Sequence, residues 1–144
     1  YGRQGEKERE IFSYQKVLQA DPRNGRAYFN LGFLEEAAGD LPGALGFYQK
    51  SVVLDPANAE GYYNMGNIYA KLKKVEEAIS SYLKAVEYDP RHMNALVNLS
   101  ILSFRKEDFV AAVKYCDEAV LLGYDAPEGY LNALAPYRQP AGEN

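Results

Sequence analysis

The sequence predicts an all-α protein, a right-handed helix-turn-helix solenoid with three full repeats flanked by partial ones. Three observations predict it: a dipeptide that recurs at a constant interval, columns of small residues, and apolar residues at helical spacing. The dipeptide is Asp-Pro, and its copies begin 34 residues apart at Asp21, Asp55 and Asp89. A period of this length is typical of stacked helical units. Such stacks present long surfaces and seldom catalytic pockets, so we expect binding and not catalysis.

Each repeated column has a physical reason. Gly32 and Gly66 fall on the first helix of a unit, where they face Ala44 and Ala78 on the second helix. Small residues let two helix backbones approach closely, and large tyrosine side chains fill the space beside that contact. Asp-Pro then ends the second helix, because proline lacks a backbone donor and excludes the helical conformation from the residue before it.

Together the columns resemble the tetratricopeptide repeat, in which an aromatic residue, Leu-Gly, Ala, a second aromatic residue and Pro recur every 34 residues. The unit at residues 59–92 matches best, with seven positions in register: Tyr62, Gly66, Tyr69, Ala78, Tyr82, Ala85 and Pro90. The resemblance covers nearly the whole chain. It implies a superhelix in which defined positions of each first helix face the inside.

The repeat period places the elements in order. We predict repeats at residues 25–58, 59–92 and 93–126, with helix pairs at 25–38 and 42–54, 59–72 and 76–88, and 93–105 and 109–122. Gly39 supplies the turn in the first pair by glycine chemistry, and Lys73 occupies the equivalent turn in the second. Gly46 weakens its helix by about 1 kcal/mol relative to alanine.

Partial repeats flank these units. Residues 1–24 are predicted to hold the last turn of one helix, in which Tyr1 shares the column of Tyr69, and then a second helix over residues 6–20. Residues 127–138 are predicted to form a capping helix that starts like the middle unit, with Leu134 in the glycine column and Pro136 interrupting it. Residues 139–144 are expected to be a disordered tail.

Composition excludes several classes of function. Of 144 residues, 47% are apolar and 25% charged, which is typical of a soluble protein. The net charge of −4 argues against nucleic acid or an anionic membrane as partner. One cysteine forms no internal disulfide, so the compartment is undetermined, with the cytoplasm favoured. We find no metal-ligand spacing, phosphate loop or nucleophile motif, and we expect no cofactor.

An asparagine column is the main candidate for binding. The sixth position of each first helix holds Asn30, Asn64, Asn98 and Asn132, and the resemblance implies that this position faces the inside. Asparagine is unfavourable within helices, yet its amide can pair with the backbone of an extended peptide. The column is similar to the asparagine ladder in the tetratricopeptide domain of O-GlcNAc transferase. The alternative is that these amides bond neighbouring helices and hold the stack together.

The inner face implied by the resemblance is otherwise apolar. Its apolar members are Phe29, Phe33, Tyr63, Val97, Ile101, Phe104 and Leu131, interrupted by Glu36, Asn67, Lys71 and Arg105. Such a track suits a partner segment, although these side chains could instead pack against the next repeat. Domains of this family that grip chaperone tails place Lys and Arg beside Asn. The corresponding positions here hold Phe29, Phe33, Asn64, Asn94 and Asn98, so capture of such tails is not expected.

We therefore predict a non-enzymatic module that binds an extended or helical peptide segment of another protein, with no nucleic acid or membrane as partner. The residues expected to contact the peptide are Asn30, Asn64, Asn98, Asn132, Phe29, Phe33, Tyr63, Asn67, Val97 and Ile101. One alternative is a scaffold that self-assembles into a homo-oligomer through its open amino-terminal end, where Ile11, Phe12 and Tyr14 need cover. Another is a docking domain of a larger enzyme.

Overall fold

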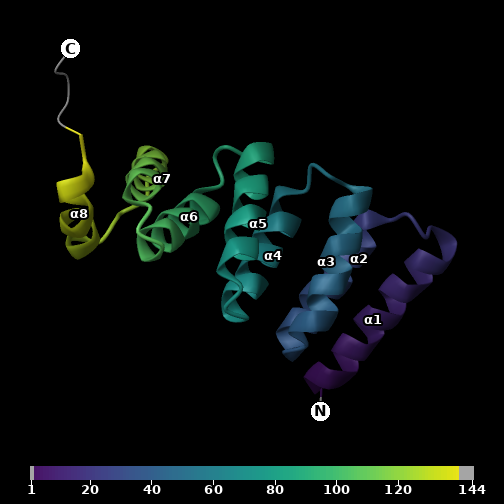
Figure 1. Ribbon diagram of the computed structural model, residues 1–144. Coiled ribbons are helices and arrows are strands. Elements are labelled where there is room, and N and C mark those ends of the chain that lie inside the picture. Colours follow the sequence, from purple (N-terminus) through teal and green to yellow (C-terminus); the bar gives the residue numbers. More distant parts are fainter. Residues whose placement is uncertain (1, 140–144) are drawn as a thin grey trace.

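The computed structural model describes residues 2–139, and within that range every regular element is a helix (Figure 1). The α-helices are α1 (Gly2–Ala20), α2 (Gly25–Ala38), α3 (Leu41–Leu54), α4 (Ala59–Lys71), α5 (Val75–Tyr88), α6 (Met93–Arg105), α7 (Phe109–Leu121) and α8 (Glu128–Leu134), followed by the 3-10 helix η1 (Ala135–Tyr137). The helices α2 and α3, α4 and α5, and α6 and α7 pack as pairs. The pairs follow one another from α1 at the right of Figure 1 to α8 at the left. The predicted all-α solenoid is confirmed.

The six helices of the three pairs begin and end within one residue of the predicted positions. Their first helices share one kind of N-cap, in which a side chain accepts a hydrogen bond from the backbone N–H three residues later. Asn24 accepts from Ala27 at 2.9 Å, and Asn58 accepts from Gly61 at 3.0 Å. Such caps satisfy donors that the helix itself leaves unpaired.

The turn within each pair uses a left-handed residue in one column. Gly39 has φ +85°, and the equivalent Lys73 and Glu107 have φ +61° and +62°. This conformation is natural for glycine and strained for a residue with a Cβ atom. The fold therefore keeps the backbone path of the turn even where the sequence supplies no glycine.

The prediction for the amino-terminal segment is wrong. We expected one helix to end near Gly5 and another to begin at Glu6, but α1 runs unbroken from Gly2 to Ala20. Gly5 lies in the turn column of Gly39, yet it has no left-handed φ. The segment around it is rich in Gln, Glu, Lys and Arg, which favour continued helix. Tyr1 and residues 140–144, with most of the predicted tail, lie outside the described residues.

Close packing within a pair depends on a tyrosine ring that lies against a glycine. A Cβ atom on Gly32 would lie 2.8 Å from the ring of Tyr48, and one on Gly66 would lie 2.6 Å from the ring of Tyr82. Both rings are almost completely buried, and each belongs to an apolar cluster that its helix shares with the first helix of the next pair. The two glycines therefore provide the space that these rings occupy.

In the third pair, Ser100 occupies the column of Gly32 and Gly66. Its hydroxyl donates to the backbone carbonyl of Ala112 on α7 at 2.7 Å, which ties the two helices together. Because that hydroxyl has one proton, it must accept the second bond, 2.7 Å long, from the hydroxyl of Tyr130 on α8. Leu134, also on α8, is fully buried against Ala112 and Cys116. The larger residue in the glycine column thus packs back onto α7.

We predict that Gly46 responds to alanine in the opposite direction from Gly32 and Gly66. Gly32→Ala and Gly66→Ala force a methyl group into a tyrosine ring and should lower the free energy of unfolding by roughly 1–3 kcal/mol. Gly46→Ala meets no atom within 4 Å, so it should raise that free energy by about 0.5–1 kcal/mol through helix propensity. Urea unfolding of the three variants measures this. Equal responses would contradict the packing described here.

Candidate functional site

Two pockets open on the surface formed by the first helices α2, α4 and α6. The first groove pocket, of about 360 Å³, is lined by Phe33, Glu36, Ala37, Asn64 and Lys71. The second groove pocket, of about 240 Å³, is lined by Ala70, Tyr82, Asn98, Ile101, Leu102 and Arg105. They are equivalent sites one repeat apart, since Asn64 and Asn98 share a column, as do Lys71 and Arg105. The repeat therefore produces the same kind of site twice.

The buried tyrosines of the second helices extend their hydroxyl groups to this surface. The hydroxyl of Tyr48 donates to Oε2 of Glu36 at 2.9 Å, and that of Tyr82 donates to Oδ1 of Asn67 at 2.6 Å. Burial raises the pKa of Tyr48 well above its ordinary value, and the bond to Glu36 raises it further. Burial, followed by the neighbouring Tyr63, raises the pKa of Tyr82 to about 12. Both phenols therefore stay neutral donors at physiological pH.

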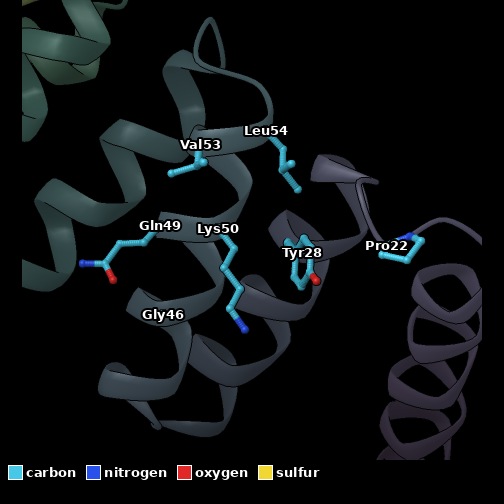
Figure 2. Close-up of a pocket in the computed structure, with 7 residues that line it drawn as sticks. All are labelled: Pro22, Tyr28, Gly46, Gln49, Lys50, Val53 and Leu54. Carbon is cyan, nitrogen blue, oxygen red and sulfur yellow. The ribbon is translucent and has the colours of Figure 1, made fainter.

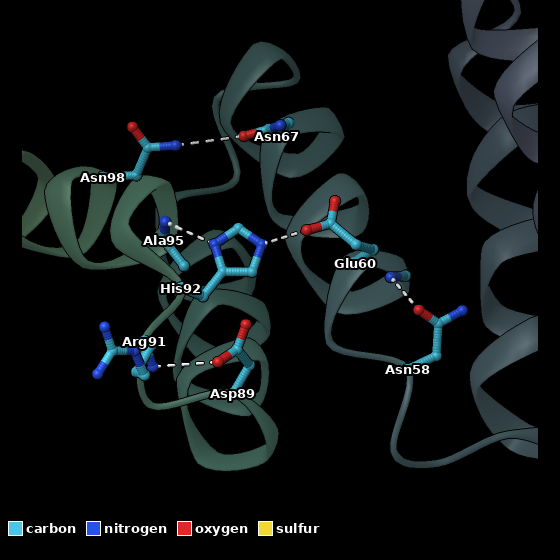
Figure 3. Close-up of polar contacts among 9 residues, drawn as sticks. Asn58, Glu60, Asn67, Asp89, Arg91, His92, Ala95 and Asn98 are labelled. Carbon is cyan, nitrogen blue, oxygen red and sulfur yellow. Dashed lines mark hydrogen bonds and ion pairs between the residues drawn. The ribbon is translucent and has the colours of Figure 1, made fainter. Parts of the chain in front are cut away.

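Asn67 joins the second and third units (Figure 3). Its Oδ1 accepts from Tyr82 on α5 and also from Nδ2 of Asn98 on α6, at 3.3 Å. Figure 3 shows the Asn98 oxygen directed away from this bond. Asn98 thus bonds another helix, as expected if the asparagine column holds the stack together. Its oxygen accepts no hydrogen bond from residues 2–139.

The structure distributes the other predicted contact residues unevenly. Phe33 is 59% exposed at the first groove pocket, and Ile101 lines the second. Phe29 packs against Tyr48 with ring centroids 5.5 Å apart, and Tyr63 packs against Tyr82 at 5.9 Å. The remaining three, Asn30, Val97 and Asn132, do not line either groove pocket, and Asn132 is exposed on α8.

The charges of the two groove pockets differ. Lys71 lies 3.4 Å from Glu36, so the first groove pocket contains its own ion pair. Arg105 occupies the column of Lys71, but Ala70 occupies the column of Glu36. Within residues 2–139, Arg105 makes no ion pair and no side-chain hydrogen bond. The second groove pocket therefore has a cation without a counter-ion in that range.

Sequence reasoning missed the role of His92, which caps α6. Its Nδ1 accepts from the backbone N–H of Ala95 at 3.2 Å, so the ring proton lies on Nε2, 2.6 Å from Oε1 of Glu60 (Figure 3). The side chain is buried against Tyr63, with ring centroids 4.6 Å apart. The signal was present in the sequence, because His92 shares the column of the caps Asn24 and Asn58.

A larger pocket was also missed, and it lies away from the groove pockets. It measures about 540 Å³ and is lined by Pro22, Tyr28, Gly46, Gln49, Lys50, Val53 and Leu54 (Figure 2). The equivalent pocket of the next unit, at Tyr62 and Ser80, measures about 260 Å³. There Tyr88, in the column of Leu54, stacks on Tyr62 with ring centroids 5.7 Å apart. Gly46 and Leu54 of the first unit are smaller than Ser80 and Tyr88 at the equivalent positions, which leaves this pocket more open.

Chemically reactive clusters are not found in the described range. Residues 2–139 contain no group of three or more His, Cys, Asp or Glu side chains that could hold a metal ion. Cys116 is buried, and burial raises the pKa of its thiol, which keeps it protonated. In the same range, no helix combines the length and the apolar character that crossing a bilayer requires.

Models of the tetratricopeptide repeat match the chain at residues 13–46 and 59–92, and a model described as the TPR repeat matches residues 35–73. These matches together span more than half of the 144 residues, and the range 59–92 coincides with the predicted middle unit. Comparison with curated protein sequences finds no significant match.

Solved structures share the fold. A crystal structure of MamA has a TM-score of 0.74 at 25% identity, covering 84% of this chain and 71% of that one. YrrB, described as a TPR protein with an unusual peptide-binding site, has a TM-score of 0.71 at 26% identity, covering 76% and 57%. A structure of pilF from Pseudomonas aeruginosa, with a TM-score of 0.75 at 21% identity and coverage of 86% and 58%, is similar in fold. This chain thus spans less than two thirds of the YrrB and pilF structures.

We predict that the cap at His92 can be separated from the ring itself. His92→Ala removes the acceptor for the Ala95 N–H, whereas His92→Asn restores the residue type of the other caps. The free energy of unfolding of the Ala variant should therefore be about 1 kcal/mol lower than that of the Asn variant. Urea unfolding checks this, with Asn58→Ala as the matched loss in the preceding unit. Equal stability of the two His92 variants would contradict a capping role.

We also predict alkaline destabilisation. Tyrosine titrates near pH 10 in an unfolded chain, whereas the folded state raises the pKa of Tyr82 to about 12. The neutral phenol is thus favoured by folding, so its stabilisation is complete below about pH 10 and is lost as the pH rises through 12. Urea midpoints at pH 8 and pH 11 should differ less in Tyr82→Phe than in the wild type. An unchanged difference would show that Tyr82 does not contribute.

Proposed function

Because the chain belongs to the tetratricopeptide-repeat family, we propose that it binds an extended or helical segment of another protein along α2, α4 and α6. Its repeats make it a protein–protein interaction module. The observation that carries the proposal is the pair of equivalent groove pockets one repeat apart. A polypeptide is itself periodic, so a surface that repeats its pockets suits it better than a compact small molecule.

Apolar contact supplies most of the affinity in this proposal. Phe33 is a large side chain left mostly exposed beside the first groove pocket, and the half-buried Ile101 lines the second. Covering them removes apolar surface from water. Phe29 and Tyr63, which pack on the buried tyrosines, form the floor beneath the segment, and Val97 extends it.

The asparagine column supplies orientation. Asn64 and Asn98 line the two groove pockets, and each carries an amide that can pair with a peptide backbone. Asn67 holds Asn98 in place from α4. Asn30 and Asn132, in the same column on α2 and α8, would continue the contact toward either end of the segment. Binding of this kind needs no catalytic group, so we propose a non-enzymatic module.

The likeness to YrrB supports this choice. That protein is described as having a peptide-binding site, and it shares 26% identity with this chain over the matched region. The fold alone hosts many ligands, so the proposal rests on the groove pockets and not on the likeness.

A second candidate function is self-association through α1. None of the residues of α1 is buried, and Phe12 and Val17 are 57% and 39% exposed. Another copy of the chain could cover this face. Light scattering at high protein concentration tests it, because a strict monomer would rule out strong self-association.

We predict that loss of the two pocket amides weakens peptide binding. The probe is an acetylated, amidated nonapeptide selected from a random library for binding to the protein. Asn64→Ala combined with Asn98→Ala should weaken its affinity about tenfold, since two hydrogen bonds are lost. Fluorescence anisotropy measures the affinity.

Gln15→Ala is the control, because it removes an exposed amide from α1. Urea unfolding of the double variant shows how much of the effect is structural, since Asn98 also bonds Asn67. Unchanged affinity together with unchanged stability would remove the asparagine column from the proposal.

A further inference from the structure

The second groove pocket combines an exposed cation, Arg105, with apolar and hydrogen-bonding groups. Ala70, Ile101 and Leu102 supply apolar walls, and Asn98 supplies an amide. The hydroxyl of Tyr82 already donates its one proton to Asn67, so it has no proton to donate to a ligand. Lys106, next to Arg105 in the chain, is paired with Glu76. Arg105 is therefore the charged group that this pocket presents to a ligand.

We propose that the second groove pocket binds the side-chain carboxylate of an Asp or Glu in the partner segment, with Arg105 as counter-ion and Asn98 as an additional donor. This inference rests on the proposed function, since it assigns the chemistry of one residue of the bound segment. A guanidinium presents paired donors that match the two oxygens of a carboxylate.

The charge of the ligand follows from the count of cations. One unpaired guanidinium balances the single charge of a carboxylate, whereas a phosphorylated side chain carries between one and two charges and is best held by several cations. The first groove pocket differs, because Lys71 already forms an ion pair with Glu36 there. That pocket consequently favours an uncharged residue, packed against Phe33 and Ala37.

The two preferences imply a spacing. The bond between Asn67 and Asn98 shows that side chains of α4 and α6 meet, although each of these helices packs more extensively against α5 than against the other. Packed helices lie roughly 8–10 Å apart, and α4 and α6, which meet through side chains, lie at least that far apart, whereas an extended chain advances about 3.3 Å per residue. The acidic residue should therefore lie three or more residues from the uncharged residue in the first groove pocket.

Arg105 also stands in the last turn of α6, where any cation stabilises the helix end. A purely structural role would change stability without changing the choice of ligand. The two roles are separated by measuring a preference between peptides and not an affinity alone.

The test uses acetylated, amidated nonapeptides, each selected from a random library and then synthesised with Glu or Gln at every position in turn. For the wild type we expect one position at which Glu binds roughly threefold to tenfold more tightly than Gln at low salt. Arg105→Gln should abolish that preference while the Gln peptide keeps its affinity. Ala70→Glu, which copies the Glu36 column into the second groove pocket, should abolish it as well.

Arg91→Gln is the matched control, because it removes the same charge from the exposed loop between α5 and α6 and should keep the preference. A further peptide with Gln at the scanned position and a free carboxyl terminus distinguishes a terminal carboxylate from a side chain. If only that peptide gains affinity, the proposal is wrong about the source.

The outcomes distinguish this inference from the proposed function. If no peptide of the library binds, groove binding itself fails, and this inference fails with it. If peptides bind with equal affinity for Glu and Gln, or if the preference survives Arg105→Gln, the carboxylate assignment is overturned while groove binding remains. A preference for phosphoserine over Glu at the same position would also overturn it.

Discussion

The contact between a glycine of the first helix and a tyrosine ring of the second organises the rest of the structure. With no side chain on Gly32 or Gly66, the rings of Tyr48 and Tyr82 lie directly against the opposing backbone. That position carries each hydroxyl through the pair to the far surface, where it meets Glu36 or Asn67. One packing constraint thus sets both the closeness of the helices and the positions of polar groups along the groove pockets.

The third unit shows that the constraint is geometric and not tied to one residue pair. Ser100 is small enough for the close approach, and its hydroxyl replaces ring packing with a hydrogen bond to α7 and another to α8. The same small column that forms a repeat therefore also fastens the capping helix. Leu134, a large residue in that column, fits because α8 packs only backward, onto Ala112 and Cys116 of α7.

Much of the fold could be predicted from the sequence, because a strict period repeats each signal and every copy supports the others. Helix ends were found where the period and Pro22, Pro56 and Pro90 recur. The error at Gly5 arose because the period indicated a turn, whereas helix propensity determined the local structure of α1. The groove residues could be predicted column by column, but the ion pairs between side chains of different columns could not. That Glu36 neutralises Lys71 while Arg105 stays unpaired depends on side-chain geometry that no single column contains.

The bond from Asn98 to Asn67 connects the groove to the joint between two units. At 3.3 Å it is a long hydrogen bond, and an amide whose oxygen accepts a bond becomes a better donor at its nitrogen. A ligand that donates to the free Asn98 oxygen would therefore shorten and strengthen the joint. A bound ligand would then stiffen the protein, since the second and third units would resist bending against each other more strongly than in the empty protein.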